Sequence, residues 1–409
     1  MKKIEYKWIV YVICFVTIFV CLGFCSSNKS IYLSVITEAF NIKRSLYSIN
    51  DSCRFVASTI INLFFGTLIS RFCAKKLMAA GYISLILSML IYANATDIWG
   101  FYVGGCFLGI GLPLTTTTMV SYIINSWCHE HKGAIMGFVL AADGVGSAVA
   151  TQIVTPVIYQ EGNAFGFQQA YKLTALILLV TGVLVVVFYR NAPSHVNVHA
   201  PRNEKQKEVW PGLTFQQAIR KPYFYVIAVC ILLTGSVLRG VHGIYAAHLT
   251  DVGIGVEYMA MVVGVQALVL TASKFLTGLF NDCFGLRITM FCCDVAAVIA
   301  FVALAIASPT VGGKASTMIF GVTFSFALPL ETIILPLITE HIFGQKSYTQ
   351  ILGILLAVNT AGFALGTPII NVVYDLCGTY KPILIIFALL MAVITVVFQR
   401  IFIVVNKEI

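Results

Sequence analysis

Four basic residues stand inside stretches that are otherwise apolar and long enough to lie in a lipid bilayer; they are Lys29, Arg54, Arg239 and Lys274. A charged side chain at the middle of a bilayer costs about 2.5–3.5 kcal/mol on insertion scales, so four isolated bases would cost on the order of 10–14 kcal/mol. Such bases are stable where they face water or acids. The clear intramembrane acids are Asp143 and Glu331, with Asp294 nearer a membrane face. The surplus of bases predicts a wet cavity that attracts small anions.

Two pairs of polar residues share the apolar stretch 222–250. Arg239 and His242 are three residues apart and therefore face one way on a helix. His248 and Asp251 repeat that spacing at the end of the stretch. We expect one pair to line the cavity and the other to gate it. A packing role stays open for each histidine, and Asp251 also fits a helix end.

The acids are candidates for proton coupling or gating. Asp143 lies on a glycine-rich face, and acids inside membrane helices often form proton relays. Alternatively, Asp143 forms a permanent ion pair with Arg54 or Lys29, and for Arg54 we favour such a structural ion pair over contact with a ligand. Glu331 lies between two prolines, where breaks in the helix could open a gate.

Two neutral polar residues complete the candidate binding set. Thr116 belongs to a run of four threonines and could offer its hydroxyl to a carboxylate, although threonine also bonds its own helix backbone. Asn359 stands 216 residues after Asp143, at the matching position of an internal repeat described below. We expect these residues to contribute to substrate binding.

The composition shows what must position these side chains. The 409 residues are 59% hydrophobic and only 11% charged, against about 25% charged in ordinary soluble domains. A membrane helix needs about 20 apolar residues, and with short loops roughly 34 residues serve one crossing, so the length predicts about twelve crossings. The sequence therefore predicts an all-helical membrane protein. The twelve cysteines form no CxxC pair, so neither a metal site nor a disulfide framework is expected.

Hydropathy places the spans in two groups of six. The predicted spans are 8–38, 46–70, 77–95, 98–127, 132–159, 168–190, 222–250, 257–281, 288–307, 314–342, 348–375 and 380–405. The long polar stretch between them contains three prolines and reads as a cytoplasmic linker. We predict an N-terminal bundle over 1–190, a linker over 191–221 and a C-terminal bundle over 222–409.

The distribution of Lys and Arg predicts the orientation. With both termini in the cytoplasm, the inner loops hold 17 of these residues and the outer loops hold 5. The net charge of +9 comes from these loops and forms no continuous stripe, so nucleic acid is not an expected partner. We expect a multi-pass protein of the cell membrane with cytoplasmic termini.

A repeated loop element supports the two-half organisation. The later copy has the form Gly-x-x-x-Asp-x-x-Gly-x-Arg, with Gly278, Asp282, Gly285 and Arg287, and the earlier copy includes Gly66 and Arg71. In the earlier copy Ser70 replaces the acid and Cys73 replaces the second glycine. A second match, at an offset of 216, pairs Gly137 with Gly353 and Gly146 with Gly362. Duplicated halves are typical of secondary transporters.

The loop element resembles the cytoplasmic loop motif of the major facilitator superfamily. Three stretches further resemble its monocarboxylate transporter and oxalate–formate antiporter branch: Asn28–Ile31, Ala247–Gly253, and the Ile342–Lys346 and Tyr374–Tyr380 pair. The resemblance implies two pseudo-symmetric six-helix bundles that rock about a midplane site. It also implies a small monocarboxylate or dicarboxylate as substrate, with protons or a counter-anion as the coupled species.

The resemblance assigns two bases. Lys274 occupies the place of an arginine that holds the substrate carboxylate in this branch, and Leu270 stands where the branch has an acid one turn earlier. Lys29 resembles a lysine whose deprotonation is coupled to substrate binding. Each lysine could instead extend to a membrane interface, and Lys274 could pair with Glu331.

The sequence thus predicts a secondary transporter of small organic anions, proton-coupled or anion-exchanging, acting as a monomer without cofactor or metal. Another substrate class, as in a drug exporter or amino-acid carrier, and a non-transporting receptor are the alternatives. There is no Walker loop, HExxH or nucleophile elbow, so an enzyme is not expected.

Overall fold

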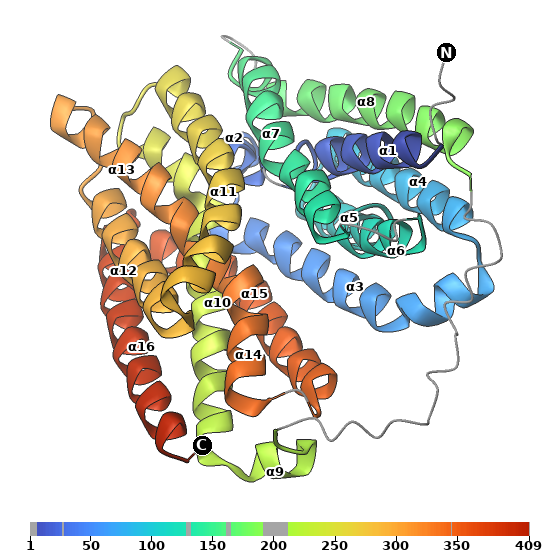
Figure 1. Cartoon of the computed structure of the whole chain (residues 1–409). Coiled ribbons are helices and arrows are strands. Elements are labelled where there is room, and N and C mark those ends of the chain that lie inside the picture. The colour runs from blue at the N-terminus through green and yellow to red at the C-terminus, as the bar shows by residue number, and fades with distance from the viewer. Residues whose placement is uncertain are drawn as a thin grey trace. The chain divides into compact units, whose positions relative to one another are not determined.

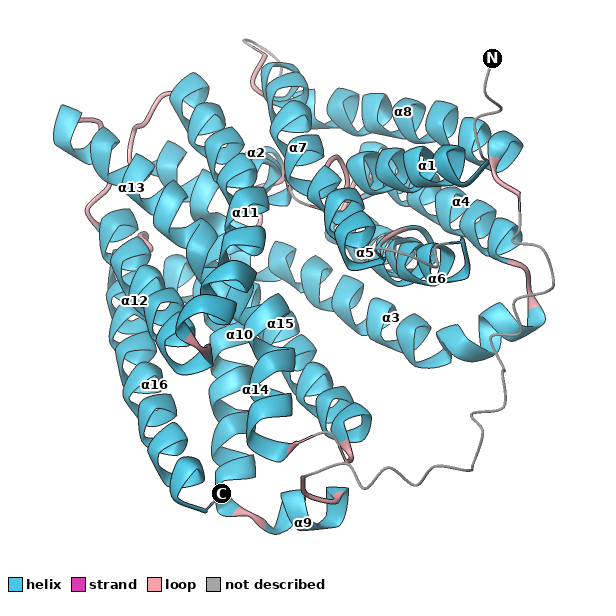
Figure 2. Cartoon of the chain, in the orientation of Figure 1, coloured by secondary structure: helices cyan, strands magenta, loops and turns pink. Residues whose placement is uncertain are grey.

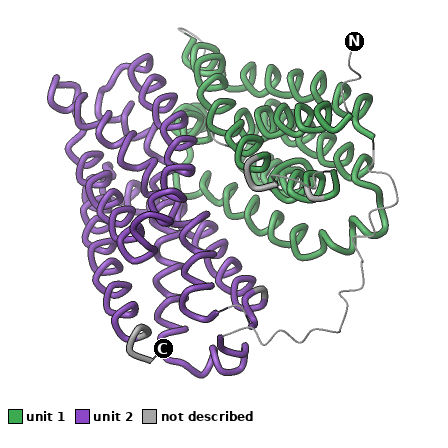
Figure 3. The backbone as a smooth tube through the Cα atoms, in the orientation of Figure 1, with its two compact units in different colours: residues 1–205 green, residues 206–409 purple. Residues whose placement is uncertain are grey.

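The computed structural model describes residues 6–26, 28–127, 132–160, 165–190, 212–344 and 346–408. Almost all of this part of the chain is helical (Figure 2). The chain divides into two compact units, residues 1–205 and 206–409 (Figure 3).

The described residues of the first unit form eight helices, labelled in Figure 1. They are α1 (Tyr6–Cys21), α2 (Lys29–Ala39), α3 (Arg44–Arg71), α4 (Ala74–Ala93), α5 (Ile98–Thr115), α6 (Thr117–Trp127), α7 (Lys132–Ile158) and α8 (Gly166–Phe188).

The second unit holds the remaining elements of the described chain. They are α9 (Phe215–Arg220), α10 (Pro222–Asp251), α11 (Val256–Phe284), α12 (Leu286–Ala305), α13 (Val311–Ala327), the π-helix η1 (Leu330–Ile334), α14 (Leu335–Phe343), α15 (Tyr348–Cys377) and α16 (Lys381–Glu408).

Eleven helical segments of the described chain are long and apolar enough to cross a membrane. They include α5 joined to α6, and α13 joined through η1 to α14. The predicted first span, 8–38, differs: it is not one helix, because α1 is a shorter apolar helix of 16 residues and α2 starts only at Lys29. The all-helical membrane fold predicted from composition is confirmed.

Two further spans contain breaks. The predicted span 98–127 is divided at Thr116, three residues after Pro113, whose ring removes a backbone donor and crowds the preceding turn. The predicted span 314–342 contains η1, a π-helical turn that includes Glu331. π-Turns inside α-helices occur mostly as single turns at functional sites.

Glycines let the helices approach closely within each unit. A Cβ at Gly109 of α5 would lie 2.8 Å from the Cβ of Ala57 on α3, and one at Gly240 of α10 would lie 2.9 Å from the carbonyl oxygen of Gly366 on α15. Small residues at helix interfaces are typical of membrane bundles, because packing replaces the hydrophobic effect as the associating force.

The division into bundles and linker stays a prediction in its boundaries. Residues 191–211 of the predicted linker lie outside the described residues. Within the rest of that stretch, α9 begins with a capping box, in which the Thr214 hydroxyl accepts from the backbone of Gln217 and the Gln217 side chain accepts from the backbone of Thr214.

Candidate functional site

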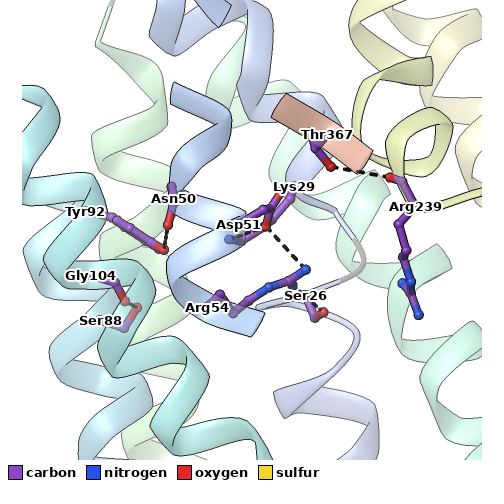
Figure 4. Close-up of polar contacts among 10 residues, drawn as sticks. All are labelled: Ser26, Lys29, Asn50, Asp51, Arg54, Ser88, Tyr92, Gly104, Arg239 and Thr367. Carbon is purple, nitrogen blue, oxygen red and sulfur yellow. Dashed lines mark hydrogen bonds and ion pairs between the residues drawn. The ribbon is translucent and has the colours of Figure 1, made fainter. Parts of the chain in front are cut away.

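The first unit contains a buried cluster of two bases and one acid. The Lys29 amino group lies 2.9 Å from Oδ1 of Asp51, and Nη2 of Arg54 lies 3.3 Å from the same oxygen (Figure 4). Arg54 also donates a hydrogen bond from Nη1 to the hydroxyl of Ser26, at 2.9 Å. The side chains are 8–15% exposed, so the pairs are shielded from bulk solvent.

The break between α1 and α2 positions Lys29. Asn28, at the start of α2, is 1% exposed, and its Oδ1 accepts hydrogen bonds from the hydroxyls of Thr151, at 2.9 Å, and Ser147, at 3.3 Å. These contacts tie the break to α7. Lys29 follows directly and therefore projects from a fixed helix start toward α3.

Asp51 is not among the acids predicted from the sequence. For Asp143, an ion pair with Arg54 or Lys29 is one of the two roles that the sequence left open, and the pairs described above are made by Asp51. The signal was present, because Asp51 and Arg54 are three residues apart on one helix and so are neighbours on its surface. Asp143 lies half-buried on α7. Its part in proton coupling stays a prediction.

The second unit contains an ion pair between Arg239 of α10 and Glu331 of η1. Nε of Arg239 lies 3.2 Å from Oε2 of Glu331. The Glu331 side chain is 1% exposed, whereas that of Arg239 is 30% exposed. The guanidinium also lies 4.7 Å from the ring centroid of Phe363, a cation–π distance, and the Arg239 carbonyl accepts from the hydroxyl of Thr367 (Figure 4).

Lys274 of α11 is the second base near Glu331. It is half-buried, and its charge acts electrostatically on Glu331. Within the described chain, no acid lies within ion-pair distance of Lys274, so it differs from the paired Arg239. In the second unit, two bases thus act on one buried acid, Glu331.

The other predicted binding residues lie in differing surroundings. His242, one turn after Arg239, lies with its ring near-parallel to Phe324 at 6.2 Å. Asn359 of α15 is buried against α10, where its Oδ1 would lie 2.5 Å from a Cβ at Gly235. The Thr116 hydroxyl donates to the carbonyl of Leu112 at 2.6 Å, so in this structure it bonds the helix backbone at the break between α5 and α6.

The predicted gating pair lies at the end of α10. His248 is 1% exposed, with Nε2 lying 3.2 Å from the carbonyl oxygen of Leu304 and its ring edge-on to Tyr380. Asp251 is the exposed last residue of the helix. His248 therefore ties α10 to α12 and to the residue before α16, which is the packing role that its sequence position left open.

The repeated loop element lies at two helix junctions. Gly285 joins α11 to α12 with φ +79°, a left-handed conformation that favours glycine. Arg287 donates from Nε to Oε1 of Gln399 at 2.7 Å, which ties this loop to α16. The remaining members lie at open or exposed positions: Gly66, Arg71, Gly278 and Asp282.

A family model described as Major Facilitator Superfamily matches residues 13–342. The chain belongs to the major facilitator superfamily. The resemblance seen in the loop element is therefore confirmed, and the chain is a multi-pass membrane transporter rather than an enzyme.

Relatives in the superfamily are distant. An uncharacterized MFS-type transporter, YcxA of Bacillus subtilis (strain 168), is 25% identical over 86% of this chain and 84% of its own. Monocarboxylate transporter 13 of Bos taurus is 24% identical over 76% of this chain and 70% of its own. The crystal structure of the nucleoside transporter NupG superimposes with a TM-score of 0.77 and 14% identity, covering 98% of this chain and 99% of that one. That likeness establishes the major facilitator fold.

Proposed function

We propose that this major facilitator protein is a secondary active transporter of small organic anions, a monocarboxylate or small dicarboxylate, that works by alternating access. The observation that carries the proposal is the Arg239–Glu331 ion pair, with Lys274 as an additional base beside it. Two cations beside one buried acid carry a net positive charge, and a bound anion neutralises that charge.

Arg239 is the group that receives the carboxylate. Its side chain is 30% exposed while Glu331 is 1% exposed, so a ligand reaches the base before the acid. The planar guanidinium can bind a carboxylate through two parallel hydrogen bonds. Lys274 adds a point charge without that geometry and strengthens the attraction. The aromatic ring of Phe363 beside the guanidinium suits a carboxylate with a small apolar body.

Glu331 supplies the coupling. When a substrate carboxylate takes Arg239, the buried Glu331 carboxylate loses its partner, and an unpaired buried charge is strongly destabilising. Uptake of one proton by Glu331 removes that charge, which gives symport of an anion with a proton. In the exchange version, the positive cluster instead resists closure until a second anion binds, and the carrier returns only when loaded.

The first unit carries a parallel group. There, Lys29 and Arg54 share the carboxylate of Asp51. We propose that Lys29 contributes to anion binding and that Arg54 keeps Asp51 in place. One relative, Monocarboxylate transporter 13, is named for substrates of this class, which agrees with the proposal.

The test is transport in reconstituted vesicles. Uptake and counterflow of labelled lactate and oxalate are measured with and without a pH gradient, first for the unaltered chain and then for Arg239→Gln. Arg220→Gln, at the exposed end of α9, is the matched control. We expect the first variant to lose uptake and the control to keep it.

Other results would redirect the assignment. Full uptake by Arg239→Gln contradicts the carboxylate site. Failure of every carboxylate, together with stimulation by lipophilic cations, favours a drug exporter, and ligand binding without flux favours a receptor. Stimulation by an inward proton gradient indicates symport, and trans-stimulation by a second anion without any gradient effect indicates exchange.

The orientation and setting are part of the same proposal. Because 17 of the 26 Lys and Arg residues fall on one side of the predicted topology, we place both termini in the cytoplasm and the chain in the cell membrane as a monomer. Labelling of an added terminal tag, in intact and in opened cells, tests the orientation directly.

A further inference from the structure

The second unit contains a small cavity with Glu331 of the Arg239–Glu331 pair in its wall. Its volume is about 20 Å³. The polar side chains that line it are Thr234, Asp294, Glu331 and Asn359, and the remainder of the wall is apolar. A cavity of this size has room for a single water molecule, which needs about 10–15 Å³. Two acids from different elements, α12 and η1, therefore border one water-sized space.

Asp294 stands out because its carboxyl is buried without a partner. The residue is 1% exposed, and neither carboxyl oxygen accepts a hydrogen bond from any described residue. The hydroxyl of Thr395 on α16 donates to the carbonyl of Met391, at 2.7 Å. Within the described chain no base lies within ion-pair distance of Asp294.

The titratable groups around Asp294 supply no positive charge to it. The thiols of Cys230 on α10 and Cys293 on its own helix are the near neighbours, and Glu331 lies across the cavity. From α11, the charge of Lys274 acts on Glu331. The bases of the other packed helices lie elsewhere: on α13, Lys314 lies over the ring of Tyr258, and on α16, Lys381 and Arg400 are exposed.

Burying an unpaired carboxylate costs several kcal/mol. Burying the neutral acid costs far less, and its O–H group can donate a hydrogen bond. A metal cation is disfavoured as the neutralising ligand, because Arg239 and Lys274 bring two positive charges to Glu331 on the cavity wall. A proton adds no net charge beyond neutralising the acid. The chemistry of the cavity thus selects H⁺.

We propose that Asp294 is a proton-binding site and that it exchanges its proton with Glu331 through the cavity. In the empty carrier the proton resides on Asp294, and Glu331 is charged and paired with Arg239. The role of Asp294 in coupling rests on the proposed function. When the substrate anion binds Arg239, the O–H bond of Asp294 breaks and the proton forms an O–H bond with the Glu331 carboxylate. Asp294 then takes a proton from solvent, so one proton is absorbed for each anion bound.

Infrared spectroscopy of the purified full chain, without substrate, tests the site itself. We expect the carbonyl stretch of a protonated carboxylic acid at neutral pH, which moves in deuterated water, disappears in Asp294→Asn and persists in Asp282→Asn, an exposed aspartate used as control. A band that is unchanged in Asp294→Asn overturns the proposal. If that variant does not fold, isotope labelling of the aspartate carboxyl carbons must shift the band in the unaltered chain, and a band that does not shift overturns it equally.

Transport then tests the relay separately from the substrate assignment. In vesicles, Asp294→Asn should lower uptake driven by a pH gradient about a hundredfold, as expected for loss of a positioned proton donor, and leave anion counterflow intact. Gradient-driven uptake that is unchanged in Asp294→Asn contradicts the relay even if Arg239→Gln confirms the anion site. Loss of the anion site alone leaves the infrared result standing.

Discussion

Gly146 and Gly362, 216 residues apart, make the same kind of backbone contact in the two units. A Cβ at Gly146 of α7 would lie 2.3 Å from the carbonyl oxygen of Phe19 on α1. A Cβ at Gly362 of α15 would lie 2.4 Å from the carbonyl oxygen of Leu232 on α10. The internal repeat therefore extends from the sequence to the contact between the first and fifth spans of each unit.

Alanine at either glycine should destabilise the protein. The obstructing atoms belong to backbone, which cannot move aside without separating the helices, so Gly146→Ala and Gly362→Ala should each lower the unfolding free energy by about 1–3 kcal/mol. Thermal unfolding in detergent measures this as a lower midpoint.

The same repeat provides the control. Gly137 and Gly353, the other matched pair, have nothing within 4 Å of an added Cβ. Alanine there should leave the midpoint unchanged or raise it, because alanine is the better helix former by up to about 1 kcal/mol. Equal midpoints for all four variants would show that the close contacts are not needed.

Removing the acid of the first cluster should be more harmful than removing the acid together with one base. Asp51→Asn removes the carboxylate that pairs with both Lys29 and Arg54, which should cost about 3–5 kcal/mol. Lys29→Gln combined with Asp51→Asn removes one of the two bases together with their shared acid. We expect the double variant to unfold at a higher temperature than Asp51→Asn alone. The reverse order would mean that the three side chains do not act as one electrostatic group.

The helical membrane fold could be predicted from composition, because about twelve apolar stretches leave no other way to satisfy the backbone in lipid. The acid that pairs with Lys29 and Arg54 was harder to predict. It is Asp51, which lies near the start of α3, where hydropathy does not distinguish an acid in a loop from an acid in a membrane helix. Lys29 reaches Asp51 because the start of α2 is held in place by the hydrogen bond that Asn28 accepts from Thr151 of α7.

The second cluster shows the same limit. Proline spacing indicated a break near Glu331, but a π-turn depends on the hydrogen-bond pattern that the packed helix adopts, and no residue type specifies it alone. The sequence places Asp294 nearer a membrane face, and that position stays a prediction. Its burial in the wall of the cavity that Glu331 also lines depends on how α12 packs in the unit, which periodicity does not determine.

Lys274 should act on the affinity for the anion. Lys274→Ala removes a charge that no acid in the described chain neutralises at ion-pair distance. Loss of a charged contact to the substrate should weaken the binding free energy by about 1.5–3 kcal/mol, which raises KM about tenfold or more. Lys274→Arg should retain most of the affinity. Initial rates of uptake against substrate concentration measure both. Lys381→Ala, at the exposed start of α16, is the control, and intact uptake by Lys274→Ala would remove this residue from the binding site.

The π-turn should matter for coupling more than for folding. Deleting Thr332, an exposed residue of η1, lets the turn close as ordinary α-helix while α13 and α14 keep their faces, because a π-turn accommodates one residue more than an α-turn. Glu331 would then turn away from Arg239, and proton-driven uptake should be lost although the protein still folds. Deleting Ile386 from the regular helix α16 is the control: every later residue rotates by about 100°, and the protein should not be recovered. Proton-driven uptake by the Thr332 deletion would show that the turn does not position Glu331 for coupling.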